Sequence, residues 1–125
     1  INLNSDEALG ALRIVSSGNS LPDPIAISAS DLSTASNFQG MRVRMTGVTL
    51  DNPSEWPTSP LNTGGGANVN ATFESTSFII RIDRGESAQD GSPVPSQPFT
   101  LTGILGRFAD DVQVFPFFET DIQNQ

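Results

Sequence analysis

The sequence lacks four residue types that carry much of protein chemistry. Cysteine, histidine, lysine and tyrosine are all absent from its 125 residues. Without cysteine there are no disulfides, no thiolate zinc sites and no cysteine nucleophile. Carboxylates are then the acid–base groups that remain, and no spacing marks two of them as a pair of the kind that glycosidases use. We therefore expect a protein that is not an enzyme and that carries no cofactor.

Long apolar runs and basic segments are missing as well. No run approaches the roughly 20 apolar residues of a membrane-spanning helix, and no basic stretch precedes an apolar one as in a signal peptide. All six positive charges are arginines, and fourteen carboxylates oppose them, which gives a net charge of −8. Only 16% of the residues are charged. This composition favours an extracellular or cell-surface protein, and the start at Ile1 rather than Met suggests a processed or excised segment.

Nine prolines and eleven glycines punctuate short apolar runs, a pattern typical of an all-β chain. Residues 77–84 alternate clearly, with Phe78, Ile80 and Ile82 on one face. Residues 41–50 alternate up to Gly47, where the apolar set changes face and predicts a bulge. Residues 99–108 repeat the Thr-Gly pattern around Gly103. Long strands with a central glycine predict a small closed or partly open barrel.

The remaining elements are shorter. A short strand is expected over residues 24–28 and one helical turn over 28–36, with polar loops at 51–70 and 85–97. Pro116 lacks an amide donor, so the last strand, residues 111–118, should lie at an edge or end its ladder there. The predicted core consists of Val43, Met45, Phe78, Ile80, Ile82, Leu101, Ile104, Val112 and Val114.

The order of these pieces resembles a known family. "PIAISASDL", "FQGMRVRMTGV", "SFIIRID" and "PFTLTGILGRFADDVQVFPFFETDI" resemble the OB-fold-like domains of large secreted bacterial proteins, which occur beside exonuclease, phosphatase, lamin-tail or surface-anchoring modules. The match spans about residues 24 to 122. It implies an OB-like barrel, which we expect as a five-stranded domain over residues 23–125. Residues 1–22 precede it as an N-terminal segment, which the aromatic run after residue 114, described below, makes a candidate edge-pairing strand. The aromatic "FPFF" and the Pro- and Gly-rich loop before Phe73 depart from the family pattern.

A nucleic-acid site is one hypothesis, because OB barrels often bind single strands through cationic grooves and aromatic platforms. Arg42, Arg44 and Arg81 lie on outward strand faces, where Phe115 or Phe118 would stack on bases. The competing interpretation is that these arginines pair with nearby carboxylates such as Glu74, Asp83 or Asp111. The negative net charge favours the second interpretation.

A calcium site is a weaker hypothesis. Asp110 and Asp111 share a predicted hairpin tip, and Asp83, Glu86 and Asp90 bracket the earlier loop "DRGESAQDG", residues 83–91. Calcium needs several converging oxygen ligands, and no EF-hand spacing is present. Because Asp and Gly are ordinary turn residues, we expect no metal site.

The aromatic run after residue 114 indicates a protein partner. Phe115, Phe117 and Phe118 fall on both faces of a strand, so a barrel interior cannot hold them all. An exposed apolar patch beside an edge strand is typical of a binding surface, unless residues 7–15 or the Trp56 loop cover it. We expect the N-terminal stretch to add to this edge as a strand, with the pockets receiving Leu9, Leu12 and Ile14.

The donor stretch would come from the same chain or from a neighbour, and a neighbour would give a head-to-tail filament. The sequence therefore predicts a non-catalytic extracellular structural or interaction module that is able to self-assemble. The alternative is an accessory nucleic-acid-binding OB domain of a secreted nuclease-type protein.

Overall fold

Strands make up most of the regular structure in the described part of the chain. The computed structural model describes residues 23–33, 38–108 and 111–124. In chain order the elements are β1 (Ile25–Ala26), α2 (Ala29–Ser33), β2 (Arg42–Leu50), η2 (Pro53–Glu55), β3 (Gly66–Phe73), β4 (Thr76–Asp83), β5 (Phe99–Phe108), β6 (Asp111–Phe115), η3 (Glu119–Asp121) and β7 (Ile122–Asn124). The predicted N-terminal segment, residues 1–22, lies outside the described residues, and with it lie Leu9, Leu12 and Ile14.

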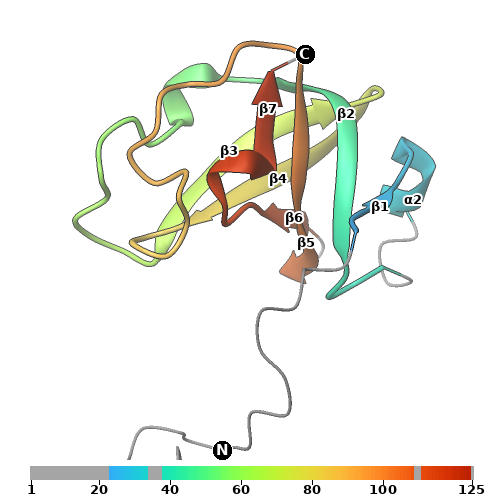
Figure 1. Cartoon of the computed structure of the whole chain (residues 1–125), viewed down its shortest axis with the longest axis horizontal. Coiled ribbons are helices and arrows are strands. Elements are labelled where there is room, and N and C mark those ends of the chain that lie inside the picture. The colour runs from blue at the N-terminus through green and yellow to red at the C-terminus, as the bar shows by residue number, and fades with distance from the viewer. Residues whose placement is uncertain (1–22, 34–37, 109–110, 125) are drawn as a thin grey trace, which may run out of the picture.

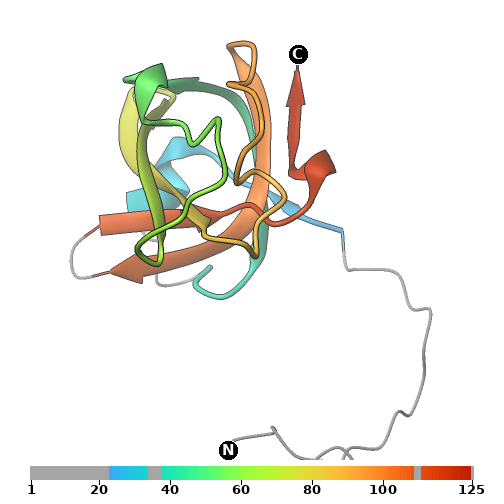
Figure 2. The same ribbon diagram turned by 90° about the vertical axis from the view of Figure 1, so that its left-hand side faces the viewer.

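Five of the strands close into a barrel in the order β2-β3-β4-β6-β5, because β5 pairs back onto β2 (Figures 1 and 2). The neighbours in this barrel are antiparallel except β4 and β6, which are parallel. This arrangement confirms the predicted all-β, five-stranded barrel with one short helical turn, and it is compatible with an OB-like fold.

Two short strands continue the barrel wall. β2 pairs with β3 only at its C-terminal end, Val48–Leu50. Nearer its N-terminal end, at Val43 and Arg44, β2 pairs with β1. In the same way β5 pairs with β6 over its second half and with β7 at Phe99, Thr100 and Leu101. β1 therefore pairs with the part of β2 that β3 leaves unpaired, and β7 pairs with the part of β5 that β6 leaves unpaired.

The two strand glycines behave differently. Gly47 has a φ of 87° and coincides with a register shift between Thr46 and Val48, so the predicted bulge is confirmed. The predicted core places Ile104 inward after Gly103, and this is wrong, because Phe99, Leu101, Gly103 and Leu105 are the inward set of β5 and Ile104 is only partly buried. A Cβ on Gly103 would lie 2.7 Å from the Phe115 carbonyl oxygen, so glycine is needed here for close strand approach.

The core matches most of the predicted residues. Seven of the nine are buried, whereas Ile104 and Val112 are only partly buried. Leu105 takes the place expected for Ile104, because the alternation of β5 is unbroken. Trp56, Phe73 and Phe99 add large side chains to the same cluster. Burial of this continuous apolar cluster stabilises the barrel.

One barrel strand was missed from the sequence. The predicted loop 51–70 overlaps β3, which pairs with β4 over its whole length. The two strands are joined by Glu74 and Ser75, both with positive φ, as two-residue hairpin turns require. Neither residue is the glycine or asparagine that signals such a turn, and the Asn- and Ala-rich strand has weak β propensity.

Candidate docking site

The chain after β6 forms a C-terminal extension, residues 116–124, that polar contacts hold against the barrel. The β6 ladder ends at Phe115, as Pro116 predicts. The main-chain N–H groups of Phe117 and Phe118 then donate to Asp121 Oδ2, at 2.9 and 3.0 Å. Asp121 is only 2% exposed, and its Oδ1 lies 2.9 Å from Arg42 Nη2 on β2. One carboxylate thus shapes the turn and ties it to the barrel.

The loop between β4 and β5 supplies the remaining partners of the extension. Ser87 Oγ donates to the Pro116 carbonyl at 2.6 Å, and Ala88 N donates to the Phe117 carbonyl at 2.7 Å. Gln89 Nε2 donates to the Phe118 carbonyl at 2.9 Å. The main chain of residues 116–118 is therefore occupied. The loop therefore already bonds to main-chain groups of the stretch at which the sequence predicts an added strand, and that pairing stays a prediction.

The aromatic residues of this region are partly covered. Phe115 and Phe117 are half-buried, and the side chain of Phe118 is 49% exposed. The loop of residues 85–98 bonds to the main chain of residues 116–118. The Trp56 loop supports it, since Trp56 Nε1 donates to the Ser92 carbonyl at 3.1 Å. Phe118 therefore leaves apolar surface next to η3.

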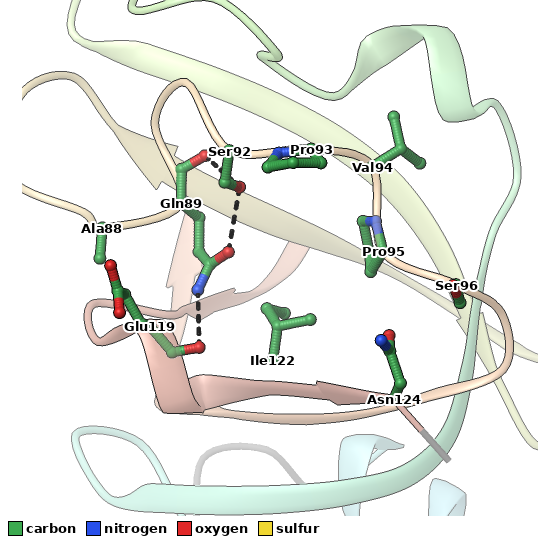
Figure 3. Close-up of a pocket in the computed structure, with 10 residues that line it drawn as sticks. All are labelled: Ala88, Gln89, Ser92, Pro93, Val94, Pro95, Ser96, Glu119, Ile122 and Asn124. Carbon is green, nitrogen blue, oxygen red and sulfur yellow. Dashed lines mark hydrogen bonds between the residues drawn. The ribbon is translucent and has the colours of Figure 1, made fainter.

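A pocket of about 470 Å³, called the docking pocket below, lies between this loop and β7 (Figure 3). Pro93, Val94 and Pro95 line its loop side, and Ile122 and Asn124 point into it from β7. Gln89 closes one end through its bonds to Ser92 and to the main chain of η3. Val94 is 38% exposed and Ile122 packs against the core. The pocket thus combines a proline-lined wall with a floor continuous with the core.

The outer edge of β7 borders this region. β7 pairs with β5, and no other strand in the described ranges pairs with it. In an antiparallel pair, each residue directs both main-chain groups either toward its partner strand or away from it. At least one residue of β7 therefore presents an N–H and a C=O to a further strand. Such an edge is a template for pairing with another chain.

The predicted nucleic-acid arginines do not form one patch. Arg42 is paired with Asp121, while Arg44 is exposed two residues further along β2. Arg81 lies on β4, where its Nη1 donates to Asn68 Oδ1 at 2.8 Å and its Nε lies 3.5 Å from Asp83 Oδ1. Arg42 and Arg81 are thus engaged by acidic or amide groups, and Asp121 is a partner that the sequence did not suggest.

A second, aromatic-lined hollow lies on the outer surface of the barrel. Its volume is about 330 Å³, and its lining includes Phe108, Phe115, Arg81 and Gln113. Phe108, at the end of β5, is 72% exposed. Phe108 is not among the site residues predicted from the sequence. Its position between Arg107 and the acidic hairpin tip could have indicated an exposed aromatic side chain.

The candidate calcium carboxylates have other neighbours. Asp90 accepts main-chain N–H bonds from Leu61 and Gly85, each at 2.9 Å, and Asp83 contacts Arg81. Glu86 and Asp111 are exposed, and Asp110 lies outside the described residues. Within the described ranges, no three acidic side chains are grouped as metal ligands would be.

Comparisons with protein-family models, with curated proteins and with solved structures found no match for this chain. The resemblance to domains of secreted bacterial proteins is therefore supported only by the barrel itself. In the part of the chain that the structure describes, no helix is long and apolar enough to cross a membrane.

Proposed function

We propose that the chain is a non-catalytic extracellular interaction module that self-assembles, into a filament or matrix, through the outer edge of β7 and the docking pocket. The observation that carries this proposal is the outer edge of β7, with which no other strand of the described residues pairs, beside a pocket lined by Val94, Pro93 and Pro95. Exposed edges are usually blocked by charge, proline or a covering segment. β7 has the sequence Ile-Gln-Asn, which contains neither a charge nor a proline.

The roles of the carboxylates support the absence of catalysis. Asp121, Asp90 and Glu74 each accept at least one main-chain N–H bond, the last from Ala29 at 2.9 Å. A carboxylate that accepts main-chain bonds in this way helps to hold the fold in place. The extracellular assignment rests on composition, because only 16% of the residues are charged and much of the polar content is Ser, Thr, Asn and Gln.

Light scattering on the full chain over a range of concentrations tests the proposal. One copy has a mass of 13.2 kDa, and we expect the measured mass to rise above this value as the concentration increases. Because the edge contact is made by main-chain hydrogen bonds and apolar side chains, the association should persist when the salt concentration is raised. A mass that stays at one copy up to millimolar protein would contradict the proposal.

A second candidate function is binding of single-stranded nucleic acid in the aromatic-lined hollow. Phe108 and Phe115 could stack on bases there, and Arg81 would approach a phosphate. The ion pair of Arg81 with Asp83 and the net charge of −8 oppose it. We expect no measurable anisotropy change for a labelled oligonucleotide at physiological salt. A micromolar affinity that weakens with salt and with Phe108→Ala would favour this function instead.

A further inference from the structure

We infer that the outer edge of β7 accepts residues 9–15 of a second copy as an added strand, with Leu12 and Ile14 directed into the docking pocket. This inference rests on the self-assembly proposed above and names the two surfaces that meet. It joins an acceptor within the described residues to a segment of chain that lies outside them.

The acceptor is defined by the register of β7. Leu101 of β5 is paired with Ile122, and Phe99 is paired with Asn124. Paired residues project to the same side of a sheet, so Ile122 and Asn124 lie on the side of the core, where the docking pocket is (Figure 3). A strand added to β7 would place every second side chain on that same side.

The donor has the sequence features of an added strand. Residues 1–21 contain no proline, so each of them has an amide N–H for a ladder. Leu12 and Ile14 are two residues apart and project to one face of a strand. A pocket with an apolar floor at Ile122 and an apolar wall at Val94 is suited to two aliphatic side chains.

The other exposed edge of the same sheet is a poorer acceptor. β1 lies on the far side of β2 and β5, and it is only two residues long. Pro24 precedes it directly and offers no N–H to a neighbour. Proline at an edge is a common way of preventing strand addition. β7 contains no proline, whereas Pro24 directly precedes β1, so β7 is the better acceptor of the two.

The separation of these two strands also favours a donor from another copy. The chain enters the described region at β1, and β7 lies three strand positions away in the order β1-β2-β5-β7. To dock on its own β7, residues 9–15 would need residues 16–22 to pass β2 and β5, which separate β1 from β7 in the strand order. A donor from a neighbour avoids that crossing. Because the acceptor and the donor are different surfaces, the contact is head-to-tail and can propagate.

Two full-length variants separate the donor from the acceptor. Leu12→Asp/Ile14→Asp disables the donor, and Val94→Asp disables the acceptor at an exposed loop position. Each should raise the dissociation constant of self-association about tenfold or more, because a carboxylate would replace an aliphatic side chain where Val94 and Ile122 form the apolar part of the pocket, to whose lining Glu119 also belongs. Ile25→Asp on β1 is the matched control, since Ile25 is 42% exposed and lies on the other edge. This control should assemble like the wild type.

Mixing the two variants gives the decisive result. Each variant retains the surface that the other lacks, so an equimolar mixture should form one-to-one dimers in light scattering, whereas either variant alone stays monomeric. If the wild type assembles but Val94→Asp has no effect, self-assembly stands and the β7 acceptor is wrong. Lower melting temperatures in both variants, with no dimer on mixing, would show docking within one chain and overturn the inference. A wild type that never assembles would overturn both proposals.

Discussion

The barrel and the C-terminal extension are held in place by different kinds of contact. The barrel surrounds an apolar cluster in which Val43, Met45 and Ile80 have no exposed surface. The extension depends on a few polar groups, chiefly Asp121, Ser87 and Gln89, which are themselves buried. Burial of apolar surface is non-directional and spread over many side chains, whereas hydrogen bonds to one carboxylate are directional and few. The extension can therefore detach locally while the barrel remains folded.

The largest effect is expected from a change in the barrel core. Ile80→Ala should lower the free energy of unfolding by about 2–5 kcal/mol, because the site is fully enclosed and cannot collapse around the missing atoms. In chemical denaturation, the midpoint should move to a lower denaturant concentration. Ile79→Ala, which changes a partly buried neighbour on the outer face of the same strand, is the control and should have a smaller effect. An unchanged midpoint for Ile80→Ala would refute the core assignment.

A smaller effect is expected where β5 and β6 approach closely. Gly103→Ala would place a Cβ 2.7 Å from the Phe115 carbonyl oxygen and 2.9 Å from Val114 Cγ1. Overpacking of this kind destabilises by about 1–3 kcal/mol. Gly106→Ala is the matched control, since its Cβ would meet only the Phe115 ring, at 3.2 Å. In thermal unfolding, the melting temperature of Gly103→Ala should lie below that of Gly106→Ala. The reverse order would contradict the strand register.

The smallest effect on global unfolding is expected in the extension. Asp121→Asn removes the charge that faces Arg42 and weakens the bonds from Phe117 and Phe118. We expect a loss of about 1–2 kcal/mol or less, because the extension can open without unfolding the barrel. Hydrogen exchange should instead accelerate in residues 117–124. Glu119→Gln, an exposed change in the same turn, should leave exchange there unaltered. Equal acceleration throughout β2 and β5 would show that the two regions are not separable.

The difference between apolar packing in the barrel and polar contacts in the extension also explains what the sequence could and could not predict. Apolar alternation predicts β2, β4 and most of the core correctly, because the period of two is visible in residues such as Phe78, Ile80 and Ile82. It predicts Ile104 wrongly because Gly103 looks like Gly47, and only the position of the Phe115 carbonyl distinguishes them. β3 was missed because its inward residues are partly small and its turn carries no glycine.

Polar contacts between distant segments leave no periodic signal. Pro116 correctly indicates where the β6 ladder ends, and "FPFF" draws attention to the region. Nothing in the sequence spacing pairs Arg42 with Asp121 or Ser87 with Pro116, which are far apart in the chain. The edge expected at residues 116–118 is therefore covered, and the open edge lies a few residues later, at β7.

Hydrogen exchange of the β7 amides at low and high protein concentration tests the central claim most directly. If a second copy adds to this edge, the amide of β7 that points away from β5 should exchange more slowly as the concentration rises, because it gains a main-chain partner. The amides of β1, on the other edge of the same sheet, should not change. Exchange at β7 that is identical at both concentrations, in a sample whose mass has risen, would contradict the claim that copies meet at this edge.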